Sequence, residues 1–182
     1  MISSYLLCAA VTGLGIFPRP EMVCEHAETI IQSSKENNLD PSLVTALIAV
    51  ESNWNHKVVS YGGACGLMQI IPKYTKKYNK EGRNFTCDEL KDPVVSITTG
   101  TKILNYWLYK YGKRNLSIGL CGYNAGFRCK GENANVAGKN YAKKVLKYKR
   151  ILDRSIRKKK HEENKNRQSC NWIFFRIGNI CF

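Results

Sequence analysis

The chain has 182 residues, of which 43% are apolar and 24% charged, and these values are ordinary for a soluble globular protein with one compact domain and tails. Beyond the first seventeen residues no apolar stretch is long enough to cross a membrane, which excludes a protein built from several membrane spans. The formal net charge of +15 is unusual and indicates a polyanionic partner: a nucleic acid, an anionic membrane or a bacterial cell-wall polymer.

The N-terminal residues 1–20 form a predicted apolar segment that is separate from the main domain. The first seventeen carry no charged side chain, and Leu6 to Phe17 is mostly apolar. This resembles the hydrophobic region of a signal peptide, with Cys8-Ala9-Ala10 as a weak cleavage site, although no basic residue precedes it. A signal or an anchor are both open interpretations.

Helix signals begin after this segment. An amphipathic helix is expected over residues 21–37. Asp40 and Pro41 then start a second helix as N-cap and first helical residue. Residues 43–50 are apolar all round, which predicts a helix that is buried on every side.

The middle of the chain alternates loops and helices. Residues 66–71 are compact, apolar and closed by Pro72, which predicts a loop with a short helix rather than a strand. The polar, lysine-rich residues 73–91 predict a surface excursion. Asp92-Pro93 repeats the start signal for a helix that ends at Gly112.

Two more helices are expected over residues 117–123 and from Tyr141 to Leu152, the second continuing into a basic tail. Strand signals are scarce and there is no internal repeat, so the predicted fold class is mainly α. The domain is expected to span residues 21–152, and the tail residues 153–182.

The positive charge is concentrated near this last boundary. Residues 139–167 contain thirteen Lys or Arg and three acidic residues. The tail is expected to contact an anionic cell-wall polymer or membrane, although a solvated helix face without a partner would have the same composition. Nucleic acid is not expected as the main partner, because no recognition motif or interleaved aromatics accompany the charge. The short end 172–177 is either β-prone or interfacial.

The eight cysteines are dispersed along the chain and none forms a Cys-x-x-Cys pair. Their spacing does not fit a metal site, and neither a metal nor another cofactor is expected. An even number permits disulfides in an oxidising compartment. Buried thiols that pack as small apolar groups are the alternative.

Glu51 is the main candidate for chemistry. It ends the apolar run 43–50, and a carboxyl at the edge of a buried helix is costly to ionise, so its pKa should rise. Such a group keeps its proton near neutral pH and can act as a general acid. No acidic residue lies between Glu51 and Glu81, whereas ordinary glycosidases need two carboxyls. A single carboxyl can be enough when the nucleophile belongs to the substrate and is already held in place, because proximity then substitutes for a second catalytic group.

Three motifs occur in order along the chain: Glu51-Ser52-Asn53, then residues 66–72 followed by Thr75, then Gly122-Tyr123-Asn124-Ala125-Gly126. From about Cys24 to Leu152 the chain resembles the soluble lytic transglycosylase (SLT) catalytic domain, a relative of goose-type lysozyme. The resemblance implies a lysozyme-like α-helical domain with a groove for peptidoglycan glycan strands.

The resemblance also implies the reaction. Glu51 would protonate the β-1,4 glycosidic oxygen between N-acetylmuramic acid (MurNAc) and N-acetylglucosamine (GlcNAc). It would then take the proton from the muramoyl 6-hydroxyl as that oxygen attacks C1, leaving a 1,6-anhydromuramoyl end. A muramidase that uses water is the nearest alternative, and an inactive glycan-binding module is the other.

Four further residues match substrate-binding positions of the family: Ser60, Gln69, Tyr123 and Asn124. The tyrosine of the family brings its hydroxyl toward the catalytic carboxyl. Each residue has a structural alternative: a turn serine, an amide that bonds loop backbone, a core tyrosine and a helix stop. From the resemblance we expect the protein to act in the bacterial cell wall or periplasm, delivered by a phage virion or exported. We expect it to be a monomer or part of a larger virion or secretion assembly.

Overall fold

The protein is described here by a computed structural model that covers residues 2–131 and 134–177, with side chains described as far as residue 166. Within these ranges the chain is helical, and its only β-type pairings are two isolated bridges in the loop 58–70. The predicted mainly α class is confirmed. The helices, in chain order, are α1 (Ser4–Thr12), α2 (Pro20–Glu25), α3 (Ala27–Glu36), α4 (Pro41–Ser52), η1 (Pro72–Tyr74), η2 (Lys76–Tyr78), α5 (Cys87–Lys91), α6 (Pro93–Asn105), η3 (Tyr106–Tyr111), α7 (Leu116–Ala125) and α8 (Val136–Ile177).

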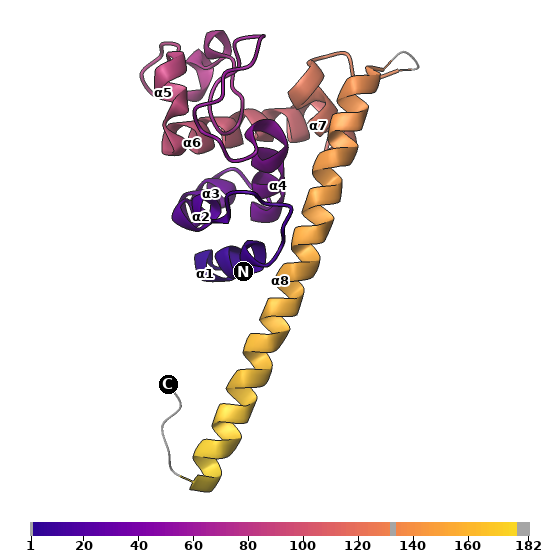
Figure 1. Cartoon of the computed structure of the whole chain (residues 1–182). Helices are drawn as coiled ribbons and strands as arrows, with labels where there is room; N and C mark the ends of the chain where they lie inside the picture. The colour runs from indigo at the N-terminus through magenta and orange to yellow at the C-terminus, as the bar shows by residue number, and fades with distance from the viewer. Residues whose placement is uncertain (1, 132–133, 178–182) are drawn as a thin grey trace.

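Helix α4 is the central element of the core. It starts as the sequence predicted, with the Asp40 carboxylate accepting a 2.9 Å hydrogen bond from the Ser42 N–H and with Pro41 in the first turn. Its apolar residues are buried nearly all round, and it packs against α3 and α8 (Figure 1). Because α4 is held on these sides, the position of its last turn is well determined.

The predicted helix over residues 21–37 is two helices. His26 has φ −105° and ψ 9°, which are not helical, and it separates α2 from α3. The break lets α2 pack beside α1, to which the disulfide Cys8–Cys24 joins it. A tertiary constraint therefore overrides a continuous amphipathic pattern.

Helix α1 belongs to the folded core of the described chain. Leu6, Leu7, Ala10 and Val11 are buried, and α1 contacts α2, α3 and α8. The Ser155 hydroxyl on α8 donates a 2.7 Å hydrogen bond to the Ala10 carbonyl.

The predicted helix from Asp92-Pro93 to Gly112 is confirmed, with one internal change. The α-helix α6 continues without a break into a π-helical turn, η3, and Gly112 ends it. Gly119 and Gly122 of α7 pack directly against Leu108, Trp107 and Tyr111 of η3, where a side chain would overlap them.

Helix α8 is a single helix of 42 residues that crosses the expected boundary at residue 152 (Figure 1). Between Lys139 and Ile177 the sequence contains neither Gly nor Pro, so nothing interrupts the helical hydrogen bonding. Its first half packs on α1, α4 and α7, and its second half extends past α1 away from the body. The end 172–177 has a helical backbone, which makes the β interpretation wrong. In the part of the chain that was searched, no helix is both long and apolar enough to span a membrane.

Candidate active site

Glu51 lies in the last turn of α4, immediately before a sharp reversal of the chain. Asn53 and Trp54 both adopt left-handed backbone conformations, with φ of 53° and 61°. Trp54 is fully buried, and Arg19 donates a 2.9 Å hydrogen bond from Nη1 to the Asn53 carbonyl. These contacts stabilise a left-handed backbone conformation that residues other than glycine rarely adopt, and they fix where α4 ends.

The Glu51 carboxyl is enclosed but not sealed from solvent. Tyr141, on α8, donates a 2.6 Å hydrogen bond from its hydroxyl to Glu51 Oε1. Burial raises the pKa of Glu51 to about 7, although the hydrogen bond from Tyr141 opposes the shift. The predicted rise of the pKa therefore has the predicted cause, desolvation at the end of a buried helix.

Among the residues that the structure describes, no second acid contributes to this shift. Burial and Tyr141 account for the altered pKa of Glu51, and among the described residues no other carboxylate perturbs it. The same part of the chain contains no group of three or more His, Cys, Asp or Glu residues that could hold a metal ion. The arrangement can donate a proton near neutral pH and accept one back.

Tyr123 lies close to the same carboxyl without bonding it. Its hydroxyl donates a 2.8 Å hydrogen bond to the Met68 carbonyl. The pKa of Tyr123 is raised well above its ordinary value by burial and by the negative charge of Glu51, so the two groups are near enough to interact. The hydroxyl that bonds the carboxyl directly is that of Tyr141, which the sequence indicated only as the first residue of an expected helix.

Ser60 and Gln69 lie in the loop 58–70, in which Cys65 bridges to Val59 and to Ile70. The Ser60 hydroxyl accepts a 3.0 Å hydrogen bond from the Ala64 N–H and so organises the turn 60–64. The Gln69 amide donates from Nε2 to the carbonyls of Val58 and Gly66, at 3.2 and 3.0 Å. Both side chains thus make the loop contacts that were their structural alternatives. Both remain at least partly exposed.

The loop is fixed against the next part of the chain. The disulfide Cys65–Cys87 joins it to α5. Gly66 has φ 76°, and a side chain there would overlap the Leu90 carbonyl, so no other residue fits. The position of Gln69, three residues after Gly66, therefore depends on how this loop packs against α5.

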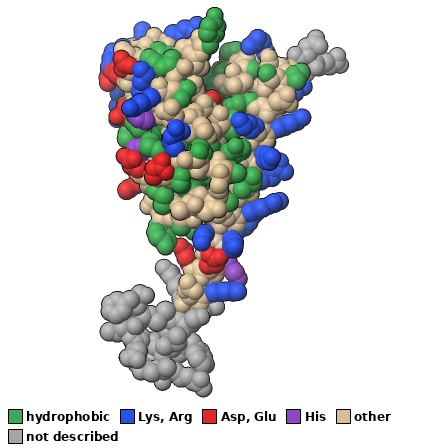
Figure 2. All heavy atoms as spheres, viewed as in Figure 1, with side chains coloured by type: hydrophobic (Ala, Val, Ile, Leu, Met, Phe, Trp, Pro, Cys, Tyr) green, Lys and Arg blue, Asp and Glu red, His purple; other side chains and the backbone are tan. Residues whose placement is uncertain are grey.

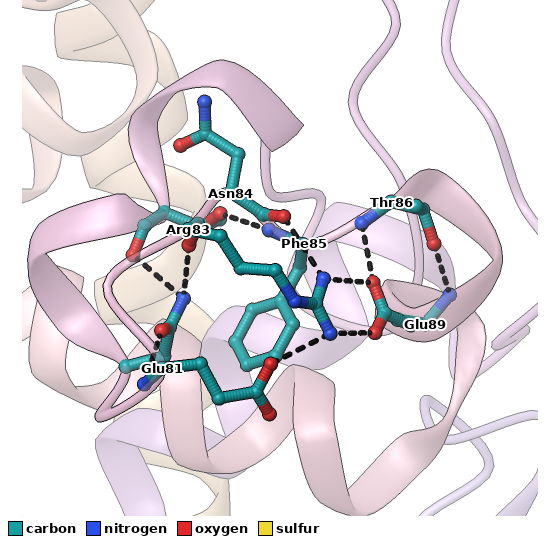
Figure 3. A network of polar contacts seen from close by, with 8 residues as sticks. Glu81, Arg83, Asn84, Phe85, Thr86 and Glu89 are labelled. Atoms are coloured by element: carbon teal, nitrogen blue, oxygen red, sulfur yellow. Dashed lines mark hydrogen bonds and ion pairs between the residues drawn. The ribbon is translucent and has the colours of Figure 1, made fainter.

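The surface excursion 73–91 is ordered by a polar network (Figure 3). The guanidinium of Arg83 contacts the carboxylates of Glu81 and Glu89, and Glu89 and Thr86 form a capping box that starts α5. These contacts lower the pKa of Glu89 to about 2. Beneath them, the buried Thr75 hydroxyl accepts a 2.7 Å hydrogen bond from the Phe85 N–H.

Asn124 lies on the other side of the site, in the last turn of α7, and is exposed. Helix α7 approaches α8 closely, because Gly138 faces Cys121 and Ala125 with no room for a side chain. The disulfide Cys121–Cys129 ties α7 to the loop that follows it. In the space-filling view the surface is hollowed between the α5–α6 side and the α7–α8 side (Figure 2).

The site therefore brings together Glu51 from α4, Tyr123 from α7 and Tyr141 from α8. The loop 58–70 reaches it through the Met68 carbonyl, which accepts the Tyr123 hydrogen bond and directly precedes Gln69. Elsewhere, a cavity of about 650 Å³ is lined by residues that include Asn105 and Arg114, and none of the predicted site residues lines it.

Comparison with known proteins decides the family. The transglycosylase SLT domain matches residues 28–146. The chain belongs to this family. The match includes Glu51, the loop 58–70, α7 and about the first quarter of α8, which are the segments that meet at the site.

Individual relatives agree with this assignment. The transglycosylase of Enterobacteria phage PRD1 is 33% identical over 125 residues, which cover 69% of this chain and 43% of the relative. The soluble lytic murein transglycosylase of Escherichia coli (strain K12) is 36% identical over 97 residues, which cover 52% of this chain and 15% of that protein. The chain thus spans less than half the length of either relative.

A solved structure confirms the predicted lysozyme-like SLT fold. An inactive mutant of the lytic transglycosylase Slt from Pseudomonas aeruginosa superposes with a TM-score of 0.65 at 23% identity. The superposition covers 78% of this chain and 25% of the other.

Proposed function

We propose that this chain is a peptidoglycan lytic transglycosylase. It cleaves the β-1,4 bond between MurNAc and GlcNAc and leaves 1,6-anhydromuramoyl ends, with Glu51 as the single acid and base. The observation that carries the proposal is the Glu51 carboxyl: its pKa is about 7, Tyr141 bonds it, and no other carboxylate among the described residues perturbs it. SLT family membership and relatives named transglycosylases support the same activity.

The proposed reaction has two proton transfers at one carboxyl. Near pH 7 about half of Glu51 carries a proton, which it donates to the glycosidic oxygen as the bond to C1 breaks. The resulting carboxylate accepts the hydrogen bond of Tyr141 and takes the proton of the muramoyl 6-hydroxyl as that oxygen bonds to C1. The substrate supplies its own nucleophile, so neither a second carboxyl nor water is required.

Four residues are proposed to bind the glycan: Ser60, Gln69, Tyr123 and Asn124. The Gln69 amide nitrogen is used by loop carbonyls, which leaves Oε1 to accept from a sugar hydroxyl. The Ser60 hydroxyl accepts from Ala64 and keeps its own proton to donate. Asn124 is exposed on the opposite side, and Tyr123 backs the carboxyl.

The proposed setting is the bacterial cell wall or periplasm, reached by delivery in a phage virion or by export. A phage transglycosylase and a soluble bacterial one among the relatives support both routes. Residues 21–152 are proposed as the catalytic unit, acting as a monomer or within a larger assembly. The basic tail 153–182 is proposed to contact an anionic polymer or membrane.

The decisive experiment is digestion of purified murein by the wild type and by Glu51→Gln, which keeps the shape of the side chain and removes the acid. We expect the wild type to release muropeptides with anhydro ends, at a rate that falls as the pH rises through about 7. The variant should release none. Glu28→Gln, an exposed glutamate on α3, is the matched control and should retain activity. Reducing ends would identify a muramidase instead, and no release by the wild type would indicate a binding module.

A stability measurement shows whether Glu51→Gln is folded. Because the pKa is raised from 4.5 to about 7, the carboxylate opposes folding, and the free energy of unfolding of the wild type falls as the pH rises between these values. The variant cannot ionise. At pH 8 its free energy of unfolding should therefore exceed that of the wild type by up to about 3 kcal/mol. At pH 4 the two proteins should be nearly equally stable.

A further inference from the structure

The outward face of α8 carries a continuous row of basic side chains, here called the basic stripe. Each member is exposed and lies three, four or seven residues from another, a spacing that puts them on one helix face. The members are Lys139, Lys143, Lys147, Arg150, Arg154, Arg157, Lys158 and Lys165. From its first to its last member the stripe runs about 39 Å at 1.5 Å per residue. Figure 2 shows basic side chains projecting along this edge of the molecule.

The charge of the stripe is not neutralised within the described chain. Between Lys139 and Lys165 the helix contains three acidic residues, Asp153, Glu162 and Glu163. Asp153 pairs with Lys149 and Glu162 pairs with Lys159, neither of which belongs to the stripe. Among the residues with described side chains, no member of the stripe forms an ion pair. A solvated helix needs no such segregation of charge, so the stripe fits an anionic partner.

The stripe and the catalytic site lie on opposite sides of the same helix. Tyr141, which bonds Glu51, is two residues from both Lys139 and Lys143, and therefore about 200° away around the helix axis. The buried residues Val145 and Leu152 lie on the same inner side as Tyr141. A partner bound along the stripe would leave the face with Glu51 free for a glycan.

The sequence at the end of the same helix distinguishes between anionic partners. α8 continues to Ile177, and it ends in Trp172-Ile173-Phe174-Phe175. Trp and Phe are favoured at the boundary between lipid headgroups and acyl chains, and a basic face adds attraction to anionic headgroups. A glycopolymer offers no apolar phase for such residues. A helix that carries this many charged side chains would lie on the surface of a bilayer rather than cross it.

We propose that the basic stripe is a docking surface for an anionic phospholipid bilayer, which holds α8 along the membrane and turns the Glu51 face away from it. The surface begins at Lys139, inside the expected catalytic unit, and not at residue 153. Charge complementarity and the aromatic end of the helix favour a bilayer over a glycopolymer as the partner.

The test is cosedimentation of the full-length protein with vesicles of phosphatidylcholine and phosphatidylglycerol. The stripe variant combines Lys143→Gln, Lys147→Gln, Arg150→Gln and Arg154→Gln, since Gln keeps helix propensity and removes charge. At about fivefold per basic residue near an anionic surface, we expect removal of the four charges to weaken binding by roughly 600-fold. Binding of the wild type should also fall with added salt and vanish on vesicles of phosphatidylcholine alone.

The matched control removes the same four charges from the other side of the molecule: Lys57→Gln, Lys73→Gln, Lys76→Gln and Lys80→Gln, all exposed. We expect it to bind within about threefold of the wild type, because only the long-range electrostatic attraction, which salt screens, is then reduced. Equal losses in the two variants would overturn the proposal, since net charge and not the stripe would then be responsible.

Two further outcomes overturn it: no binding of the wild type to anionic vesicles, or loss of murein binding by the stripe variant while vesicle binding is unchanged. The second would make a glycopolymer the partner. None of these measurements involves glycan cleavage, so the docking proposal and the proposed activity can fail separately. Retained melting temperature in the stripe variant excludes unfolding as the cause of a loss.

Discussion

A single hydrogen bond joins two parts of the chain that are 90 residues apart. The Tyr141 hydroxyl on α8 donates to Glu51 on α4 at 2.6 Å. This bond favours the carboxylate, and it lowers a pKa that burial raises. In the proposed reaction it matters most after the first proton has left, when Glu51 must act as a base.

Tyr141→Phe tests that role while keeping the ring. Without the bond the pKa of Glu51 should rise above about 7, so the decline of muropeptide release should move to higher pH. The maximal rate should fall about 10- to 100-fold, because the carboxylate loses its donor. The measurement is the pH profile of release from murein.

Tyr148→Phe is the matched control, a tyrosine on the same helix whose ring packs edge-on against Phe17. It should keep both the rate and the position of the decline. If Tyr141→Phe behaved in the same way, Tyr141 would be only a packing residue.

Residue types and local pattern were enough to single out Glu51 and the cause of its altered pKa. They were not enough to predict the role of Tyr141, since a tyrosine on the inner face of an amphipathic helix is ordinarily interpreted as a core residue. The distinction depends on what the helix packs against. A tyrosine matched to Glu51 was expected within the motif 122–126, and the structure places the direct bond on the next helix instead.

At the scale of the element, the loop 58–70 depends on one backbone position. Gly66 and Gly63 both have φ 76°, but only at Gly66 would a side chain meet another part of the chain, the Leu90 carbonyl. A substitution at Gly63 therefore introduces backbone strain alone, whereas one at Gly66 adds a steric overlap.

Gly66→Ala should lower the free energy of unfolding by roughly 3 kcal/mol or more, because strain and overlap add. Gly63→Ala should cost about 1 kcal/mol, from strain alone. Urea unfolding of both variants measures the difference. Equal losses would show that the loop can move away from α5 at little cost, despite the disulfide Cys65–Cys87.

Element starts were predictable where the signal is local. Asp40-Pro41 and Asp92-Pro93 start α4 and α6 because a cap and a proline act on the adjacent turn. The interruption at His26 was not predictable, because the periodicity of residues 21–37 is continuous and the disulfide Cys8–Cys24 depends on α1 lying nearby.

At the scale of the whole molecule, three disulfides among the described residues tie the fold together. Cys8–Cys24 holds α1 to α2, Cys65–Cys87 holds the loop 58–70 to α5, and Cys121–Cys129 closes the end of α7. The sequence left open whether the cysteines pair or pack as thiols. Three bridges use six of the eight cysteines.

Alkylation of the denatured protein without reductant should therefore label at most two thiols, Cys170 and Cys181. Cys8→Ser with Cys24→Ser should lower the free energy of unfolding by about 3 kcal/mol, the loss expected for a loop of this length. Murein cleavage should persist below the lowered melting temperature, because this bridge joins α1 to α2 and not the segments around Glu51. More than two labelled thiols in the oxidised protein would contradict the pairing.

The sequence by itself determined the mainly α class, the SLT resemblance, the position of Glu51 and the start of the principal helices. These follow from caps, from apolar periodicity and from short motifs, whose physics acts within a few residues. Only the tertiary structure decided that Tyr141 bonds Glu51, that α1 packs into the core, and that the basic residues of α8 form a stripe opposite the catalytic face. Those features depend on how distant helices pack, and the rotation of α8 against α4 and α7 is set by contacts that no local pattern encodes.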